Sequence, residues 1–423
     1  MKLVERELAD LDLAEFIRAG DGLVWGQAAA EPSPLTEALV AQRHALGPIE
    51  AFIGATWSTI ANPQYADTIR FRSYCATAGN RALAKARCLQ LVREPYSRLG
   101  ELFRTGELKA DVLMLQATQD PDTGHLMPSL ALDYLIPAME RARVCIVEVN
   151  DRAPVTYGAP VIPAELVGCV VRTSREPLGL RAAPASDAIR AVARQVASLI
   201  EDGCTLQFGI GSLPEAVLSE LYDRRDLGIH SGAFVDEAAR LSSAGVVTNA
   251  RKTLDAGVSV VGVAMGGRRA CEFIHDNRQI RFASTDYTHA ADVLAQIDDF
   301  TAINAAIEVD LTGQVNAELA AGAVVGAVGG APDFLAGAMR ARGGRAIVAL
   351  PSTAGEGEKR VSRIVASLNG PVSTTRESVG FVVTEHGVAD LRGASQRERR
   401  DRLISVASPE FRQSLRQAAE GDT

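Results

Sequence analysis

Two glycine-rich turns in this 423-residue chain could present backbone amides to a carbonyl oxygen. The stretches QFGIGSLPEAVLSEL and GAVGGAPDF carry five candidate ligand-binding residues, Gln207, Gly209, Gly211, Gly329 and Gly330. Glycine lets a ligand come close to the backbone, and N–H groups from two turns can converge on one oxygen, as in an oxyanion hole. Taken alone, either turn is also typical of an ordinary strand-to-helix connection.

Four other polar residues have types that suit general acid–base or hydrogen-bonding roles. Gln27 and Glu31 lie in WGQAAAEPSPLTEAL, His230 lies in GIHSGAF, and Asn316 lies in IEVDLTGQVNAE. The amide of Asn316 could donate to a thioester or carboxylate oxygen. Acidic residues in such turns are more often simply solvated, so the pattern alone leaves both readings open.

Ser362 and Arg363 follow an apolar run in PSTAGEGEKRVSRI, where they could bind a phosphate or a polar linker. An exposed loop would have the same composition. The six histidines and six cysteines include no pair at metal-ligand spacing, so we expect no metal site. There is no GxSxG nucleophile motif either.

The composition narrows the class of protein. A net charge of -8 argues against nucleic-acid binding, and the absence of a long apolar run argues against a membrane span. No signal peptide is visible at the start, so we expect a cytoplasmic protein whose scattered cysteines are reduced. The chain is 47% hydrophobic and 23% charged, which suits a large folded core.

Short apolar runs alternate with helical patterns along the chain. Seven runs are expected to be buried strands: 112–117, 144–149, 166–171, 258–265, 302–309, 346–351 and 380–385. Strands that are apolar on both faces and alternate with helices, such as the one expected at 187–203, predict an α/β fold with mainly parallel sheets.

Two stretches of the chain resemble one another. VLMLQA, TGHLM and PAMERARVCIVEV in the first follow the same order as AAIEV, TGQVN and GAMRARGGRAIVAL in the second. This shared order predicts two duplicated α/β halves. A stretch at 173–187 that is rich in small residues and proline separates them, so the predicted domains are 1–180 and 187–423.

Taken in their order along the chain, these motifs resemble those of the acetyl-CoA hydrolase/transferase family. The motifs that carry the resemblance are QFGIGSLPEAV, LGIHSGAF, STDYTHAADVLAQID, AIEVDLTGQVNAE, VGGAPDFLAGA, GGRAIVALPSTA, VSRIV, VTEHGVADLRG and RDRLISVASPEFRQSL. The resemblance implies two related CoA-transferase-type domains with the active site between them, a homodimer, and a CoA thioester as substrate. It implies no permanently bound cofactor.

This sequence departs from the family pattern at the nucleophile. In the family, a glutamate in an H-T-E loop after a strand attacks the thioester and becomes a glutamyl-CoA, and that loop corresponds to His230, Ser231 and Gly232 here. The family's first loop often carries histidine where this chain has Gln27, and the segment 65–88 also differs. The glycine turns and Asn316, which resemble the CoA-binding side, are kept.

Glycine cannot attack, so we expect an acyl-CoA to be cleaved by water or by a small second substrate. His230, Glu31, Glu308 and Glu237 are candidate bases. Two alternatives remain open: ordinary CoA transfer through a substitute glutamate, and a CoA-binding protein without catalysis.

Overall fold

The computed structural model describes residues 4–179 and 183–420, which form two compact units. The first unit comprises Met1–Arg181, Gly232–Asp236 and Val260–Thr288. The second comprises Ala182–Ser231, Glu237–Ser259 and His289–Thr423. The domain limits expected from the sequence, 1–180 and 187–423, stay a prediction, and part of the expected connection lies outside the described residues.

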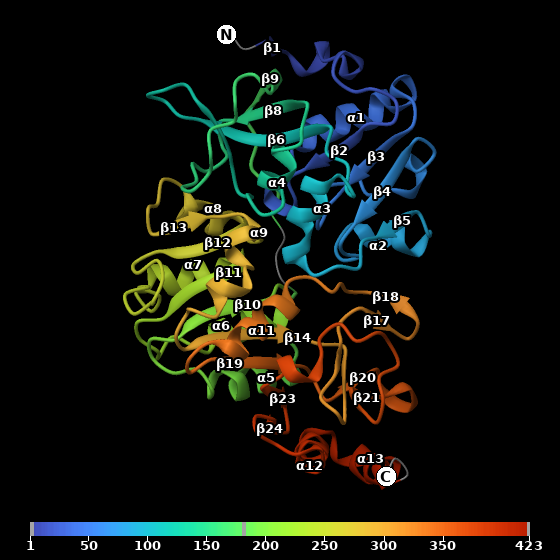
Figure 1. The fold of residues 1–423 in the computed structure, drawn as a ribbon, viewed down its shortest axis with the longest axis vertical. Helices are drawn as coiled ribbons and strands as arrows, with labels where there is room; N and C mark the ends of the chain where they lie inside the picture. Colours follow the sequence, from blue (N-terminus) through green and yellow to red (C-terminus); the bar gives the residue numbers. More distant parts are fainter. Residues whose placement is uncertain (1–3, 180–182, 421–423) are drawn as a thin grey trace. The chain divides into compact units, whose positions relative to one another are not determined.

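The first unit is built on a sheet whose strands run in the order β1-β9-β8-β6-β2-β3-β4-β5, with β7 added beside β6 (Figure 1). All neighbours in this order are parallel, and only β7 is antiparallel to its partner. The strands are β1 Glu5–Arg6, β2 Gly22–Trp25, β3 Ile49–Phe52, β4 Ile69–Ser73, β5 Leu89–Leu91, β6 Val112–Gln119, β7 Leu126–Pro128, β8 Val144–Asn150 and β9 Val167–Thr173. The unit also contains β13 Ile280–Phe282 and most of β12 Ser259–Ala264.

Helices of the first unit are α1 Ser33–Leu46, α2 Asn80–Lys85, α3 Leu99–Thr105, α4 Leu135–Met139, α8 Arg268–Ile274 and α9 Thr285–Thr288. The helix α1 places Leu35, Leu39 and Leu46 in one core cluster with Leu23 of β2 and Met114 of β6. Fully burying a leucine side chain contributes about 1.5–3 kcal/mol, so this one face fixes the helix on the sheet.

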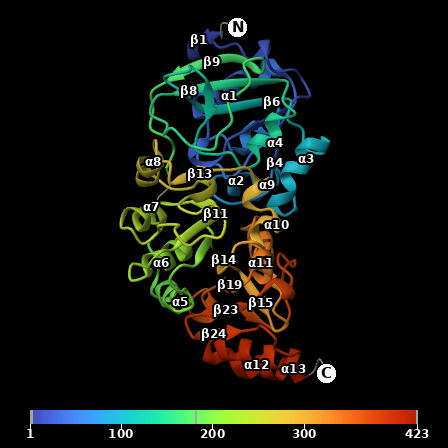
Figure 2. The same cartoon turned by 60° about the vertical axis from the view of Figure 1, so that its left-hand side comes forward.

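The second unit has the strand order β11-β10-β14-β19-β23-β24 (Figure 2). These strands are parallel except β24, which is antiparallel to β23. Their bounds are β10 Thr205–Phe208, β11 Gly228–Phe234, β14 Phe300–Ala305, β19 Arg345–Ala349, β23 Phe381–Thr384 and β24 Gly387–Asp390. Short strands follow β14 and β19: β15 Glu308–Asp310, β16 Val315–Asn316, β17 Leu319–Ala320, β18 Ala323–Val324, β20 Thr353–Ala354, β21 Val361–Ser362 and β22 Ile364–Val365.

Helices of the second unit are α5 Asp187–Ala197, α6 Ser212–Ser219, α10 Ala291–Leu294, α11 Ala331–Arg340, α12 Gln396–Val406 and α13 Arg412–Glu420, together with most of α7 Asp236–Ser243. Phe334 and Leu335 of α11 pack in a core cluster with Phe300 and Val348 of the sheet. Figure 2 shows α12 and α13 beside β24, and α12 contacts that strand.

The expected α/β fold with mainly parallel sheets is confirmed, and six of the seven expected strands appear with ends shifted by one or two residues. The run expected as one strand at 302–309 is divided between β14 and β15, which belong to different sheets. The two similar stretches contain the same order of elements: β6, β7, α4 and β8 in one, and β14 with β15, β16, α11 and β19 in the other. In both, the first and last strands are parallel neighbours. Within residues 4–179 and 183–420, no helix has the length and apolar character needed to cross a bilayer.

Candidate active site

The predicted ligand-binding turns of the second unit lie at the carboxyl edge of its parallel strands. Gly209 and Gly211 follow β10, and Gly329 and Gly330 precede α11. A methyl group on Gly211 or Gly329 would meet no atom within 4 Å, and one on Gly209 would make only an ordinary contact at 3.7 Å. Ligands of open α/β sheets bind at this edge. The backbone at these three positions is therefore open to a close approach.

Gln207 is buried and makes a reciprocal amide pair with Asn304. Its Nε2 donates to Asn304 Oδ1 at 3.3 Å, and Asn304 Nδ2 donates back to Gln207 Oε1 at 2.8 Å. The pair ties the end of β10 to β14, next to Gly209. A direct contact of Gln207 with a ligand would require this pair to open, so the observed role is to support the turn.

The GIHSGAF stretch was expected to contain a loop that follows a strand. This prediction is wrong, because all seven residues form β11. His230 and Ser231 are fully buried, and the Ser231 hydroxyl donates to Phe208 O at 3.2 Å. Burial of nearly every residue on both faces favours a central strand. Gly232 lies inside this strand and is partly exposed.

His230 belongs to a buried group of rings in the second unit, which also contains His289. The His230 ring lies edge-on to Phe300, with centroids 6.3 Å apart, and the His289 ring lies 4.4 Å from that of Phe334. Burial, with a smaller contribution from His230, lowers the pKa of His289 to about 3, so its imidazole is neutral. A methyl group on Gly330 would lie 2.6 Å from His289 Nε2. Glycine at 330 is therefore needed for this packing.

Asn316 is fully buried in β16, and its amide is occupied within the unit. Its Nδ2 donates to Glu308 Oε1 at 3.0 Å and to Leu319 O at 2.8 Å, while its Oδ1 accepts from the backbone N–H groups of Glu318 and Leu319. Both amide hydrogens are thus used. A donor role toward a thioester would require one of these bonds to be given up.

Ser362 and Arg363 lie at the end of the β20–β21 hairpin. The Ser362 hydroxyl donates to Ile364 O at 2.6 Å, whereas the Arg363 side chain is half-buried and its Nε has no hydrogen-bond partner among the described residues. The backbone of Arg363 is fixed on both sides, because its N–H donates to Ser352 O and its carbonyl accepts from Val309 N, each at 2.8 Å.

In the first unit, Gln27 is the centre of a buried polar network. Its Nε2 donates to Tyr96 Oη at 2.6 Å and to Asp133 Oδ2 at 2.7 Å. Its Oε1 accepts from Tyr74 Oη and from Ala55 N, both at 2.8 Å. Burial raises the pKa of Asp133 to about 6, although bonds from Gln27 and Tyr96 oppose the shift. Gln27 therefore holds the loop after β3 as well as a buried carboxyl group.

Glu31 holds the same loop a few residues further on. Its carboxylate accepts from the N–H groups of Trp57 and Ser58 and from the Ser58 hydroxyl at 2.5 Å. Burial raises the pKa of Glu31 to about 7, against the opposing effects of the Ser58 and Trp57 bonds and the charge of Arg175. A carboxyl group that titrates near neutrality suits a general acid or base.

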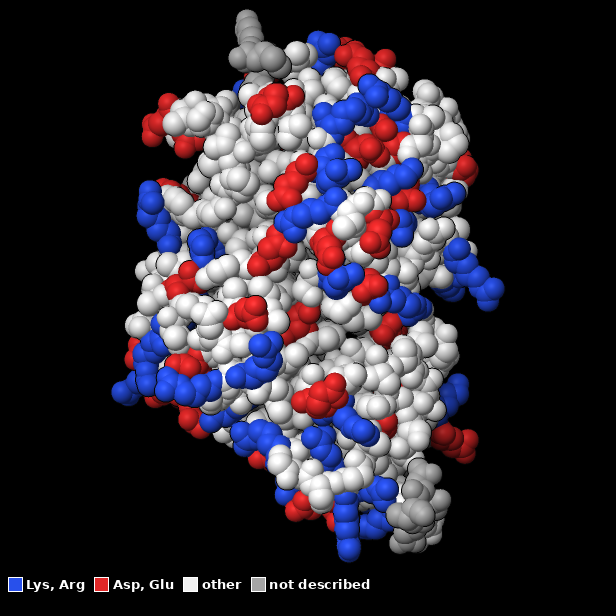
Figure 3. Space-filling model, in the orientation of Figure 1, with Lys and Arg blue, Asp and Glu red and all other residues white. Residues whose placement is uncertain are grey.

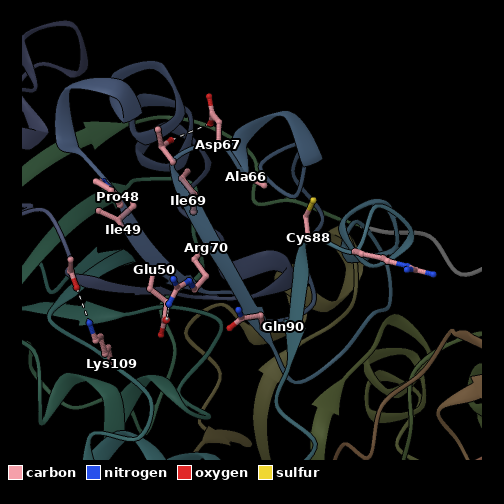
Figure 4. A pocket seen from close by; sticks show the side chains of 13 residues that line it. Pro48, Ile49, Glu50, Ala66, Asp67, Ile69, Arg70, Cys88, Gln90 and Lys109 are labelled. Carbon is pink, nitrogen blue, oxygen red and sulfur yellow. Dashed lines mark hydrogen bonds and ion pairs between the residues drawn. The ribbon is translucent and has the colours of Figure 1, made fainter.

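A separate hollow of about 460 Å³ lies at the amino ends of β3, β4 and β5 (Figure 4). Glu50 and Arg70 turn toward one another there, with 3.9 Å between Glu50 Oε2 and Arg70 Nη1, and Lys109 Nζ donates to Gly20 O. None of the predicted site residues lines this hollow, and it lies at the opposite edge from the usual ligand site of an α/β sheet.

Basic and acidic side chains are interspersed on the face that Figure 3 displays, and the expectation that the protein does not bind nucleic acid stays a prediction. Nucleic-acid binding typically uses a continuous basic stripe. In the part of the chain that the structure describes, no group of three or more His, Cys, Asp and Glu side chains could hold a metal ion.

Sequence reasoning missed three residues of these networks: Asp133, His289 and Asn304. His289 stands in the quoted motif STDYTHAADVLAQID, but its spacing from His230 gives no hint that the rings share one cluster. Asp133 lies in an otherwise apolar stretch. An acidic residue in such a stretch indicates a buried polar network, because a buried carboxyl group needs hydrogen-bond partners.

The comparisons with known proteins agree with the motifs. The acetyl-CoA hydrolase/transferase N-terminal domain matches residues 4–178, and the C-terminal domain of the same family matches residues 266–419. The chain is 40% identical over 316 residues to a 4-hydroxybutyrate coenzyme A transferase of Clostridium kluyveri, covering 74% of this chain and 73% of the relative. A butyryl-CoA:acetate CoA-transferase of Anaerostipes caccae is 31% identical, with 98% and 96% covered.

Among solved structures, RipA from Yersinia pestis superposes with a TM-score of 0.90 at 33% identity, covering 97% of this chain and 96% of RipA. Other relatives are named acetyl-CoA hydrolases, such as that of Yarrowia lipolytica at 23% identity over 73% of this chain and 65% of the relative. The chain therefore belongs to the acetyl-CoA hydrolase/transferase family and is an enzyme of that family.

Proposed function

We propose that the protein binds an acyl-CoA thioester and cleaves it by direct attack of water or a second substrate, without a glutamyl-CoA intermediate. The observation that carries the proposal is the glycine at position 232, where the family resemblance expects glutamate. A residue without a side chain cannot form the covalent intermediate.

The open backbone of Gly209, Gly211 and Gly329 supports thioester binding in the second unit. Backbone N–H groups aimed at the developing oxyanion can each stabilise the transition state by about 3 kcal/mol. In this proposal Gly330 supports the turn before α11, because it leaves room for the His289 ring. Gln207 supports the turn after β10 through its hydrogen bonds with Asn304.

The contacts of the remaining glutamates argue against a substitute nucleophile. Glu308 accepts hydrogen bonds from Asn316 and from both nitrogen donors of Asn369. Glu237 accepts from the Tyr222 hydroxyl at 2.8 Å and pairs with Arg240 at 2.6 Å. Attack by either of these two carboxylates would require hydrogen bonds to break, which costs free energy.

Glu31 is the base that this proposal favours, because it titrates near neutral pH. Its oxygens accept hydrogen bonds from Trp57 and Ser58. In this proposal the carboxyl group gains and loses a proton while these bonds keep the loop in place. The homodimer and the cytoplasmic location expected from the sequence remain predictions.

The test is turnover of an acyl-CoA panel, with detection of free thiol, combined with intact-protein mass spectrometry of the protein mixed with acyl-CoA in the absence of any reductant. We expect thiol release without any covalent adduct. A mass increase that maps to a glutamyl residue would contradict the non-covalent mechanism. Binding of acyl-CoA with neither free thiol nor a new thioester formed, with or without small carboxylates and amines, would contradict cleavage itself.

A further inference from the structure

The hollow at the amino ends of β3, β4 and β5 brings together three basic residues from separate parts of the first unit. Arg70 belongs to β4, Arg87 lies between α2 and β5, and Lys109 precedes β6. Figure 4 shows Arg70, Gln90 and Lys109 among the side chains that border the hollow. Its volume of about 460 Å³ lies within the range of roughly 300–1,000 Å³ that is typical of small-molecule sites.

Two acidic residues also line the hollow, but arginines outside its lining neutralise them. Glu50 Oε1 lies 3.2 Å from Arg72 Nη1, and Asp67 Oδ1 lies 3.3 Å from Arg43 Nε. Arg70 Nη1 reaches Glu50 Oε2 only at 3.9 Å, which is longer than a hydrogen bond. The three basic residues of the lining therefore leave a surplus of positive charge at the hollow.

Most N–H donors of these three side chains have no acceptor among the described residues. Lys109 Nζ donates to Gly20 O at 3.0 Å, and the side chain of Arg87 forms no hydrogen bond or ion pair within residues 4–179 and 183–420. Arginine carries five N–H donors in a fork that matches an oxyanion, and lysine carries three. An oxyanion would therefore replace water at these donors without breaking a hydrogen bond of the protein.

Arg87 occupies a backbone position that favours glycine. Its φ is 58°, and it directly follows the C-cap of α2. Its N–H donates to Ala84 O at 3.1 Å, and Cys88 N donates to Leu83 O at 2.9 Å, a pattern that commonly ends helices. Glycine is the usual residue in this left-handed conformation, because a Cβ is unfavourable there. A basic side chain is thus present at the rim of the hollow despite an unfavourable backbone conformation.

The charge of the lining favours a phosphate group over a carboxylate. A phosphate monoester carries about −1.5 to −2 charges at pH 7 and three acceptor oxygens, so it can meet three basic groups at once. A carboxylate brings one charge and two oxygens. The hollow is larger than a phosphate ion, and Pro48 and Ala66 add apolar atoms to its lining, which suits the organic part of an ester.

We propose that this hollow binds the phosphate group of a small phosphate monoester. The site lies at the opposite edge of the first unit's sheet from the place where ligands of α/β sheets usually bind. The inference does not depend on the proposed function, because the lining includes neither the glycine turns of the second unit nor Glu31 and its partners.

The experiment uses Cys88, a half-buried thiol that lines the hollow, as a reporter of binding. Its rate of labelling by N-ethylmaleimide, an uncharged reagent, is followed by peptide mass spectrometry, which separates Cys88 from the half-buried Cys271. Inorganic phosphate, ribose 5-phosphate and adenosine 5′-monophosphate are titrated at constant ionic strength, and acetate serves as the singly charged comparison. The concentration that halves the labelling rate measures binding at this hollow alone.

Three variants accompany the wild type: Arg87→Gly, Gln90→Glu and the matched control Arg81→Gln. Arg81 is an exposed arginine of α2 that does not line the hollow. Glycine suits the backbone at position 87, and Gln90 and Arg81 are exposed, so we expect each variant to keep at least the wild-type midpoint of thermal unfolding. Weaker binding in a variant would then not result from a loss of the fold.

We expect all three phosphates to slow the labelling of Cys88 to a plateau, with the two esters effective at lower concentrations than inorganic phosphate. Arg87→Gly should raise the half-protecting concentration about fivefold, which corresponds to one exposed ion pair. Gln90→Glu, which adds a carboxylate to the lining, should raise it at least as much. Arg81→Gln should behave as the wild type does.

The inference would be refuted by labelling that none of the phosphates slows, or by acetate that protects Cys88 as well as they do. Protection that stays at the wild-type level in both Arg87→Gly and Gln90→Glu would also refute it. Inorganic phosphate that protects as well as both esters would overturn the choice of an ester and assign the hollow to the free ion.

Discussion

Replacing Glu31 by glutamine tests the buried carboxyl group on which the proposed acid–base chemistry depends. In the wild type, burial raises the pKa of Glu31 to about 7 from an ordinary 4.5. The unfolded chain therefore ionises this group first, and the folded protein must carry a buried charge once the pH exceeds about 7. Because the folded-state pKa is the higher one, stability is fully present below pH 4.5 and is lost as the pH rises to about 7.

The pKa difference corresponds to about 3 kcal/mol of unfolding free energy between these limits. Glutamine does not titrate, so Glu31→Gln should lack this loss. The amide nitrogen that takes the place of Oε2 cannot accept the bonds from Ser58, so one of them must be lost or reversed at a cost of about 1–3 kcal/mol at every pH. The variant should therefore be less stable than the wild type at pH 5 and should approach or exceed its stability at pH 8.

Urea unfolding followed by tryptophan fluorescence measures this difference in stability between the two proteins, because the fluorescence reports on the first unit, which contains Glu31. The chain has two tryptophans, Trp25 and Trp57, and both belong to the first unit. Asp133, whose pKa is also raised, is present in both proteins and cancels in the comparison. Parallel stability–pH curves for the two proteins would refute the assignment of the raised pKa to Glu31, whatever their offset.

Three further outcomes are expected. Gly330→Ala would drive a methyl group against the His289 ring, so acyl-CoA turnover should fall at least about tenfold. Gly322→Ala meets no atom within 4 Å but strains a backbone with φ of 76°, so it should lower stability while leaving turnover unchanged. Gly232→Glu should yield a glutamyl-CoA adduct by mass spectrometry, and no adduct from a folded variant that still binds acyl-CoA would show that this position does not replace the family glutamate. In a single turnover with an acceptor carboxylate labelled by a heavy oxygen isotope, direct attack by that carboxylate should place the label in the released donor carboxylate; unlabelled product would indicate an oxygen from water or from the enzyme.

The sheet and its edges were accessible to sequence reasoning because they depend on local composition. Runs such as 144–149 are apolar on both faces, and a buried parallel strand is the structure that such runs favour. The glycine turns at 209–211 and 329–330 were also placed correctly next to β10 and α11, since glycine marks positions with positive φ or close approach.

Polar partnerships were not accessible in the same way, because they join residues that are far apart in sequence. Gln207 meets Asn304 only because β10 and β14 are neighbours in register, and Gln27 meets Asp133 across 106 positions. The error at β11 has another source: the loop was expected from the family's H-T-E pattern, whereas in this chain the stretch is a strand in which the Ser231 hydroxyl donates to Phe208 O of the neighbouring strand.

Direct attack on a thioester is energetically reasonable under the proposed function, in which no side chain acts as the nucleophile. Two amide donors at the glycine turns, at about 3 kcal/mol each, would account for a rate factor of about ten thousand. Binding the attacking molecule next to the thioester would replace the encounter of two dissolved molecules by reaction within one complex, and well-oriented groups reach effective concentrations of about 10⁵ M or more. A covalent glutamate offers mainly the same advantage, an oxygen nucleophile held at the thioester carbon. A bound second substrate would therefore take the place of a glutamate that is part of the chain.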